Sequence, residues 1–316
     1  MKQISLGSTK EQVSQIILGC SRMNSVGKNP VTAIETAYGN GINYFDHADI
    51  YGAGECERIF ADSFAKTSIP RNDIFLQSKC GIVPGERLDF SKDYILRAVE
   101  GSLKRLKTDY LDALLLHRPD TLVEPEEVAE AFYNLEKSGK VRYFGVSNQK
   151  PLQIELLKTA VTQPLIINQL QFGLGHAGMI NSGIYVNMNT SGSIDHDDSI
   201  LEYSRLQQMT IQAWSPFQFG YFEGTFLEHE KFFELNQKLA ELANKYQVTK
   251  SGIAVCWINT HPAQMQTIIG TMTPSRIEDI AQASDVTLTK AEWYALYQAA
   301  GNLLPALRAD ALNNSI

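Results

Sequence analysis

Four ionisable side chains stand at or just beyond the ends of three strongly apolar runs of this sequence. Asp46 closes the run INYFD, Lys79 lies near the end of IFLQSKC, and His117 closes LDALLLH. Tyr51 follows Asp46 closely, in the segment YFDHADIYGAGE. Burying a carboxylate, an ammonium or an imidazole is costly unless such groups pair with one another. If the three runs are neighbouring strands, their ends form one cluster that is suited to acid–base chemistry.

Each of these residues has a simpler explanation when it is taken alone. A buried polar side chain is often satisfied locally, and Asp46 with Lys79 could form a structural ion pair. Chance is a weaker explanation when all four residues lie together at the ends of neighbouring strands. A lysine there also allows the Schiff-base chemistry of a lyase or aldolase, although a carboxylate within reach of Lys79 keeps it protonated and disfavours that reaction.

The elements that must position these residues alternate along the chain. Short apolar runs, several of them continuously apolar as in strands buried on both faces, are separated by longer amphipathic runs. Eight strands that are each followed by a helix predict an α/β fold, a (β/α)₈ TIM barrel, whose active site lies at the C-terminal strand ends. A doubly wound sheet is the alternative. The predicted strands are 16–19, 42–46, 74–80, 111–117, 142–148, 166–172, 210–216 and 267–270.

Helix ends and irregular segments complete the outline. Asn, Ser, Thr and Pro are typical of helix starts, and Gly of helix ends. We expect a hairpin over residues 1–15, one domain over residues 1–316, and an irregular binding loop or lid over residues 173–199. The predicted starts are Asn29-Pro30, Ser91, Pro125 and Thr273-Pro274, and the predicted ends are Gly39-Asn40-Gly41 and Gly139.

Composition and charge disfavour several classes of protein. The 316 residues carry 28 Lys and Arg against 35 Asp and Glu, a net charge of −7, which disfavours nucleic-acid binding. No run is apolar enough for a membrane span, and the start MKQISLGSTKEQ lacks the apolar core of a signal peptide. The cysteines are widely spaced and read as free thiols, so we expect a cytoplasmic protein. They are Cys20, Cys56, Cys80 and Cys256.

The segment 45–55, F-D-x-A-x-x-Y-G-x-x-E, resembles the signature of the aldo-keto reductase family. Further motifs follow in the same order: LQSKC, LLLHRPD, GKVRYFGVSN, INQLQF, WSPF and IIGTMTPSRI. The resemblance covers about residues 4–285, and the HRPD stretch is similar to a bacterial oxidoreductase branch. It implies an enzyme that uses NADP(H) to reduce aldehydes and ketones to alcohols.

The resemblance also implies a role for each residue of the ionisable cluster. Tyr51 would be the general acid and base, and the neighbouring Lys79 ammonium would lower the pKa of its phenol. Asp46 would keep Lys79 charged and oriented. His117 would bind the substrate oxygen and fix its approach. No metal is required.

For the cofactor, the resemblance implies contacts along the same rim. The nicotinamide carboxamide would bind Ser147, Asn148 and Gln169, and the nicotinamide ring would stack on Trp214. The pyrophosphate would contact the loop that contains Ser215 and Phe217. The 2′-phosphate would lie at Gly270, Thr271, Met272 and Arg276, next to a helix N-terminus that favours anions. We therefore expect NADP(H) rather than NAD(H), although the family often has Lys where Thr271 stands and Asn where Ile280 stands.

Other interpretations stay open at this point. A barrel of this family could instead be a cofactor-binding regulatory or redox-sensing subunit, because fold does not fix function. The G-x-G-x-x-G match at 173–178 lacks an evident following helix, and the acidic run 195–198 is more typical of a helix cap than of a metal site. The partner is a small carbonyl or alcohol substrate, whose identity the sequence does not give.

Several segments are candidates for substrate specificity. They are the loops 20–28 and 80–90, the segment 217–226 and the tail after Gly301. The aromatic residues Phe217, Phe219, Tyr221 and Phe222 indicate either an apolar substrate pocket or core packing. The oligomeric state cannot be read from the sequence.

Overall fold

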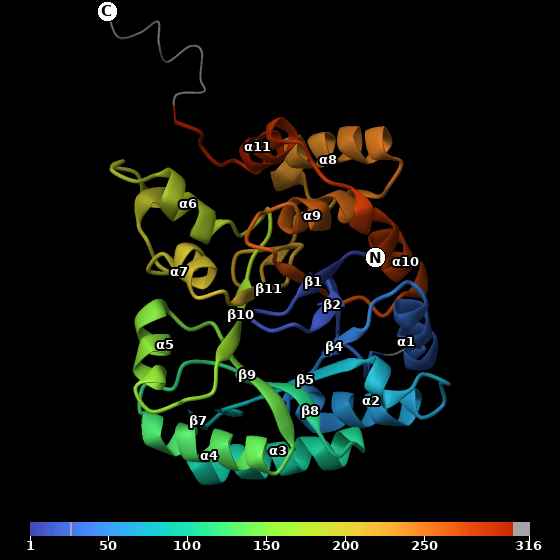
Figure 1. The fold of residues 1–316 in the computed structure, drawn as a ribbon. Helices are drawn as coiled ribbons and strands as arrows, with labels where there is room; N and C mark the ends of the chain where they lie inside the picture. Colours follow the sequence, from blue (N-terminus) through green and yellow to red (C-terminus); the bar gives the residue numbers. More distant parts are fainter. Residues whose placement is uncertain (26, 306–316) are drawn as a thin grey trace, which may run out of the picture.

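A computed structural model describes residues 1–25 and 27–305, and its centre is a closed barrel of eight parallel strands (Figure 1). The last strand pairs with the first, which confirms the predicted TIM barrel and rules out an open doubly wound sheet. In order around the barrel, the strands are β3 (Ile16–Gly19), β4 (Tyr44–Asp46), β5 (Phe75–Cys80), β8 (Leu111–Leu116), β9 (Val141–Ser147), β10 (Leu165–Gln171), β11 (Thr210–Trp214) and β14 (Gln266–Ile269).

Strand β4 is shorter than the predicted run 42–46, and the reason is local. The side chain of Asn43 accepts a hydrogen bond from the backbone N–H of Ser14 at 2.9 Å, and the Asn43 N–H donates to Ser14 Oγ at 3.2 Å. Asn43 is thereby paired with the N-terminal hairpin before the chain enters the barrel.

The helices form the outer layer of the barrel in Figure 1. The predicted helix starts are confirmed: Asn29 caps the first helix by accepting from the Thr32 N–H at 3.3 Å, and Ser91 is the N-cap of the third. No helix in the described ranges is long and apolar enough to cross a membrane. The helices are α1 (Pro30–Gly39), α2 (Glu55–Phe64), α3 (Lys92–Leu106), α4 (Pro125–Lys137), α5 (Pro151–Lys158), α6 (Gly178–Ile184), α7 (Ile200–Leu206), α8 (Phe233–Tyr246), α9 (Lys250–Asn259), α10 (Pro274–Gln282) and α11 (Lys290–Ala299).

Two small hairpins stand in loops that the sequence marks as candidates for specificity. One lies within the 80–90 loop and the other within the segment 217–226. Residue 26 of the 20–28 loop and residues 306–316 of the tail after Gly301 lie outside the described residues. The hairpins are β6 (Ile82–Val83) with β7 (Arg87–Leu88) and β12 (Gln218–Phe219) with β13 (Gly224–Thr225).

The predicted N-terminal hairpin is present as β1 (Gln3–Ser5) and β2 (Gln12–Ser14), and it closes one end of the barrel. Its apolar side chains, Ile4, Leu6 and Val13, are buried in one cluster with inward-facing residues of the barrel strands. A second, larger cluster fills the layer between strands and helices. The four cysteines are buried free thiols, as predicted.

The prediction of an irregular loop over residues 173–199 is wrong for part of that segment. Helix α6 spans Gly178–Ile184, and its Met179 and Ile180 side chains are buried. Asn181 accepts a hydrogen bond from the Tyr297 hydroxyl of α11 at 2.6 Å. A short helix rich in Gly, Asn and Ser is thus held by tertiary contacts that a local pattern does not reveal.

The prediction that no helix follows the G-x-G-x-x-G match is wrong, because α6 begins at its last glycine, Gly178. The match nevertheless serves close backbone packing. A Cβ atom at Gly173 would lie 2.2 Å from the carbonyl oxygen of Pro216, so only glycine fits there. Gly173 and His176 form an isolated bridge before α6 begins. The motif therefore joins two loops of the barrel rim and is not a dinucleotide fingerprint of an open sheet.

Candidate active site

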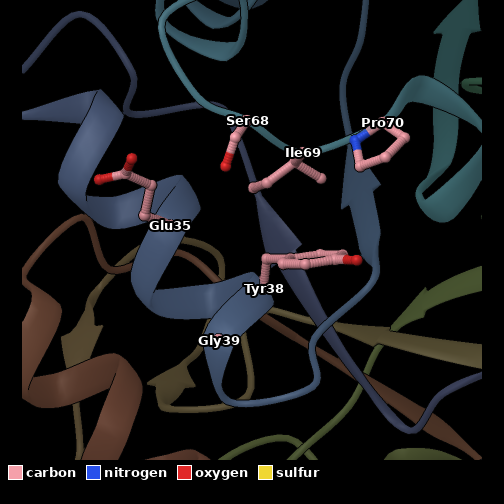
Figure 2. Close-up of a pocket in the computed structure, with 6 residues that line it drawn as sticks. All are labelled: Glu35, Tyr38, Gly39, Ser68, Ile69 and Pro70. Atoms are coloured by element: carbon pink, nitrogen blue, oxygen red, sulfur yellow. The ribbon is translucent and has the colours of Figure 1, made fainter.

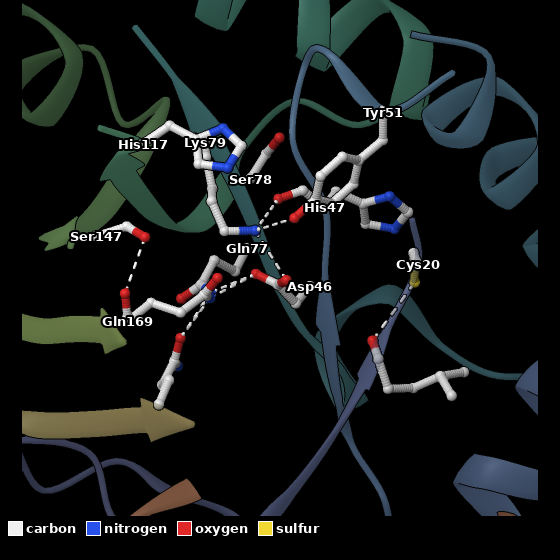
Figure 3. Close-up of polar contacts among 12 residues, drawn as sticks. Cys20, Asp46, His47, Tyr51, Gln77, Ser78, Lys79, His117, Ser147 and Gln169 are labelled. Atoms are coloured by element: carbon white, nitrogen blue, oxygen red, sulfur yellow. Dashed lines mark hydrogen bonds and ion pairs between the residues drawn. The ribbon is translucent and has the colours of Figure 1, made fainter. Parts of the chain in front are cut away.

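The four predicted catalytic residues meet at the C-terminal end of the barrel (Figure 3). Asp46 is the last residue of β4, Lys79 is the next-to-last residue of β5, and His117 follows β8 directly. Tyr51 opens a short 3₁₀ turn, Tyr51–Gly54, between β4 and α2. Adjacent parallel strands therefore bring together groups that are far apart in sequence, as the sequence predicts.

Lys79 is the centre of this cluster and is fully buried. Its Nζ donates to Asp46 Oδ2 at 2.8 Å, to the His47 carbonyl oxygen at 2.8 Å and to the Tyr51 hydroxyl at 3.1 Å. An ammonium has three donors, and all three are used. Burial alone lowers the pKa of Lys79, but Asp46 and Tyr51 outweigh that effect, so its pKa is raised and the ammonium is charged at neutral pH.

The pKa of Tyr51 is shifted in the direction opposite to the one expected. Burial is the largest influence on its phenol and raises its pKa; Lys79 opposes the rise and Asp46 adds to it. The predicted lowering of the Tyr51 pKa is therefore not found. The phenol is a protonated group at neutral pH, and its oxygen lies 3.1 Å from the Lys79 ammonium nitrogen.

His117 stands beside Tyr51, with ring centroids 6.0 Å apart and ring planes at 85°. Burial, Lys79 and Arg118 lower its pKa to about 2, so the imidazole is neutral at physiological pH. Its Nδ1 is buried without a hydrogen-bond partner among the described residues. A neutral imidazole can donate one hydrogen bond to a substrate oxygen without carrying charge.

His47 also lies in the loop that carries Tyr51, and its ring is buried. Both ring nitrogens lack hydrogen-bond partners within the described chain, and the ring packs edge-on against Phe60 at 4.6 Å. Burial and the charge of Lys79 lower the pKa of His47 to about 3. This ring is a neutral packing element, while its backbone carbonyl holds Lys79.

Sequence reasoning named Gln169 for another role but missed the other buried glutamines below the cluster. Gln77 donates to Asp46 Oδ1 at 2.6 Å, and Gln169 donates to the same oxygen at 3.0 Å. Gln212 accepts from both. The available signal was a glutamine at an inward position of several otherwise apolar strands, a residue type that is rarely buried without partners.

The residues expected at the nicotinamide amide lie together at the ends of β9 and β10. Ser147 Oγ donates to the Gln169 carbonyl oxygen at 2.9 Å and accepts from Asn148 Nδ2 at 2.8 Å. Asn148 Oδ1 accepts from Trp214 Nε1 at 3.1 Å. The Gln169 side chain, however, points its amide nitrogen to Asp46.

Trp214 ends β11 with a half-buried ring. The guanidinium of Arg118 lies 5.6 Å from the ring centroid, and Phe222 stacks on the ring at 5.9 Å. Ser215 follows with φ of +50°, a left-handed conformation that turns the chain out of the barrel. Phe217 packs against Phe226 in the loop beyond.

The aromatic residues of the segment 217–226 divide into two groups. Phe219 is buried and packs against Phe232, whereas Tyr221 and Phe222 are 72% and 57% exposed. Core packing thus accounts for Phe219, and the exposed pair stands at the rim beside Trp214.

The residues expected at the 2′-phosphate surround the start of α10. Gly270 and Thr271 are half-buried, and Arg276 is exposed and has no carboxylate partner in the described ranges. Met272 is buried in the core, so only its backbone can face a ligand. Lys28, from another loop, lies at the same helix start: its Nζ donates to Thr273 Oγ1 at 2.9 Å.

Two hollows lie outside the four-residue cluster. One, of about 340 Å³, is lined by Glu35, Tyr38, Gly39, Ser68, Ile69 and Pro70, at the end of the barrel where helices lead back into strands (Figure 2). The other, of about 240 Å³, adjoins the rim, and its lining includes Arg118, Asn148, Gln171, His176 and Asp197. Only the second shares residues with the candidate active site.

The acidic run 195–198 caps its own turn. Asp195 accepts from the N–H groups of Asp197 and Ser199, both at 2.9 Å, directly before α7. Within residues 1–25 and 27–305, no group of three or more His, Cys, Asp or Glu is arranged to hold a metal ion.

Comparison with known proteins agrees with this geometry. The sequence model of the Aldo/keto reductase family matches residues 15–300, and the chain belongs to that family of oxidoreductases. It is 34% identical over 302 residues to the oxidoreductase YcsN of Bacillus subtilis, covering 91% of this chain and 94% of that one. It is 31% identical over 311 residues to a 6-dehydroglucose reductase of Agrobacterium fabrum, covering 94% and 97%.

The fold has a close counterpart among solved structures. An aldo/keto reductase from Klebsiella pneumoniae, crystallised with NADP and acetate, superposes with a TM-score of 0.75 at 23% identity, over 96% of this chain and 97% of that one. At that identity, the likeness bears on the barrel alone.

Proposed function

We propose that this protein uses NADPH to reduce an aldehyde or ketone to an alcohol. The observation that carries the proposal is the buried chain Asp46–Lys79–Tyr51, with distances of 2.8 Å and 3.1 Å between the joined atoms. A bound nicotinamide would supply the hydride. Tyr51 gives its proton to the carbonyl oxygen as the carbon–oxygen π bond breaks and the new C–H and O–H bonds form.

The raised pKa of Tyr51 suits this direction of reaction. A phenol that stays protonated at neutral pH is available as a donor, and the Lys79 ammonium stabilises the phenolate that remains. His117 is neutral and can donate a hydrogen bond to the same substrate oxygen, which stabilises the charge that develops there.

The rim fits a nicotinamide cofactor. Ser147 and Asn148 place hydroxyl and amide groups at the strand ends, and the half-buried Trp214 ring offers an aromatic face. We propose NADP(H) over NAD(H) because Lys28 and Arg276 bring two positive charges to the N-terminus of α10, where a 2′-phosphate would be attracted.

Two alternatives have less support. A Schiff base on Lys79 requires a neutral amine, but three acceptors hold its ammonium and its pKa is raised. A regulatory subunit without turnover has no use for a buried lysine on a tyrosine hydroxyl, and the relative from Agrobacterium fabrum is a reductase. The cytoplasmic location stays part of the proposal, supported by four buried free thiols.

The direct test is turnover of NADPH. Purified protein is mixed with NADPH and a panel of aldehydes, ketones and oxidised sugars, and loss of cofactor absorbance is followed. We expect turnover with at least one substrate, and a fall in kcat on the order of 10²- to 10⁴-fold in Tyr51→Phe. Undiminished turnover in Tyr51→Phe would refute the role of the phenol, and NADPH binding without turnover across the panel would favour the regulatory alternative.

A further inference from the structure

A chain of amide side chains crosses the middle of the barrel, where interiors of this fold are usually packed with branched apolar residues. It consists of Gln77 on β5, Gln169 on β10, Gln212 on β11 and Gln266 on β14, together with the hydroxyl of Tyr44 on β4. All four glutamines are buried. Figure 3 shows Gln77 and Gln169 converging on Asp46.

The two ends of this chain fix its direction. Gln266 Nε2 donates to the backbone carbonyl oxygen of Ser14 at 2.8 Å, and a carbonyl can only accept. Gln266 therefore presents its oxygen to Gln212, whose Nε2 donates to it at 3.0 Å. Gln212 in turn presents its own oxygen to Gln77 at 2.9 Å and to Gln169 at 3.0 Å.

The direction continues to the carboxylate. With their oxygens facing away from it, Gln77 and Gln169 both donate to Asp46 Oδ1, at 2.6 Å and 3.0 Å. The Tyr44 hydroxyl accepts from Gln212 at 3.1 Å and donates to Gln77 at 2.7 Å, which closes a second path with the same polarity. Asp46 Oδ2 is thereby left to Lys79.

We propose that this directional chain of glutamines positions Asp46, and through Asp46 sets the Lys79 ammonium on the Tyr51 hydroxyl. Gln77 and Gln212 are thus positioning residues for the proton transfer, which deepens the proposed function and rests on it. Apolar residues of similar volume would fill the same space, but they would leave one carboxylate oxygen without donors and Asp46 free to rotate.

The test uses Gln77→Met and Gln212→Met in the full-length protein, with Thr267→Val as the matched control. Thr267 is buried on β14, next to Gln266, and its hydroxyl donates outward to Asn259 at 2.7 Å, away from the chain of glutamines. The readouts are thermal unfolding, kcat and KM for NADPH, and kcat/KM against pH.

For Gln77→Met we expect a 10- to 100-fold loss of kcat with KM for NADPH unchanged. The basic limb of the pH profile should move about one unit to lower pH, because a less fixed carboxylate holds the Lys79 proton less firmly. Gln212→Met should change both in the same direction by less, since it leaves the two donors on Asp46. Thr267→Val should leave the limb in place.

A second readout does not depend on turnover. In protein labelled with ¹³C at the lysine ε-carbon, and assigned with Lys79→Met, the Lys79 signal should titrate at lower pH in Gln77→Met than in the unmodified protein. If the protein reduces no carbonyl, the proposed function fails and this titration alone decides the inference. If Gln77→Met does not fold, Gln212→Met carries the same readouts. A folded variant with kcat/KM within twofold, an unmoved limb and an unmoved lysine signal overturns the proposal.

Discussion

The interiors of the two ends of the barrel differ in polarity. At the end closed by the hairpin, the interior is a cluster of apolar side chains that includes Leu6, Ile17 and Phe75. Toward the other end, the same strands carry glutamines, a carboxylate and an ammonium. The difference teaches where the stability and the chemistry of this molecule reside: apolar burial stabilises one end, and at the other end hydrogen bonds and an ion pair offset the cost of burying most of the polar groups.

The most severe test of this difference removes one member of the buried ion pair at the polar end. In Lys79→Met, Asp46 stays buried without its cation, and we expect a loss of unfolding free energy of about 3–5 kcal/mol together with loss of turnover. Denaturant unfolding measures the first effect. The double variant Asp46→Asn with Lys79→Met should regain part of the stability but no activity; an unaltered stability of the single variant would contradict the account.

At the apolar end, a cavity should cost stability and spare chemistry. Leu6 is fully buried beside β1, so Leu6→Ala should lower the unfolding free energy by about 2–5 kcal/mol. Activity measured at a temperature where the variant stays folded should remain within twofold. A large fall in kcat without loss of stability would show that the two ends are coupled more tightly than their composition indicates.

The buried titratable groups of the polar end should also make stability depend on pH, by a smaller amount. The folded-state pKa of His47 is about 3, below its unfolded value of about 6.5, so the unfolded chain binds the additional proton between these values. Stability from His47 is present above pH 6.5 and is lost as the pH falls, by about 2 kcal/mol at pH 5.

His117 has the same sign as His47, because its folded pKa is also lowered, to about 2. Asp49 has the opposite sign: burial and Glu57 raise its pKa from 3.8 to about 7, so its contribution is present below pH 3.8 and is lost as the pH rises from there to about 7. In His47→Met the fall in melting temperature between pH 7.5 and pH 5 should therefore be smaller than in the unmodified protein. An unchanged fall would show that His47 is not neutral in the folded state.

The smallest expected effect lies at the exposed rim. Lys28→Ala or Arg276→Ala should raise KM for NADPH roughly tenfold, about 1.4 kcal/mol, because each removes one of the two charges that we propose to attract the 2′-phosphate. KM for NADH should not change. Steady-state kinetics with the two cofactors check this, and an equal rise for both would place these residues elsewhere in cofactor binding.

Much of the fold could be predicted because a barrel strand is buried on both faces and reads as a continuous apolar run. Helix α6 could not, since buried Met179 and Ile180 and the contact of Asn181 with α11 hold a segment of low helix propensity. The organisation of residues 1–316 as one domain stays a prediction.

For the site, residue types and strand ends were sufficient to predict the cluster but not its electrostatics. The sequence supplies the neighbours of Tyr51 but not the depth of its burial, and burial decides the direction of its pKa shift. The contact of Lys28 with Thr273 escaped prediction because 245 residues separate the two. Gln77, Gln212 and Gln266 escaped prediction because a partner across the barrel cannot be seen in a linear pattern.

The hairpin across the barrel end has one more consequence. Its apolar side chains pack on inward-facing residues of strands that are widely separated in the sequence, from Ile17 on β3 to Ile268 on β14. Contacts over such sequence distances form late in folding, because many residues must first be ordered between them. Residues 4–13 therefore cannot complete their packing until residue 268 is in place.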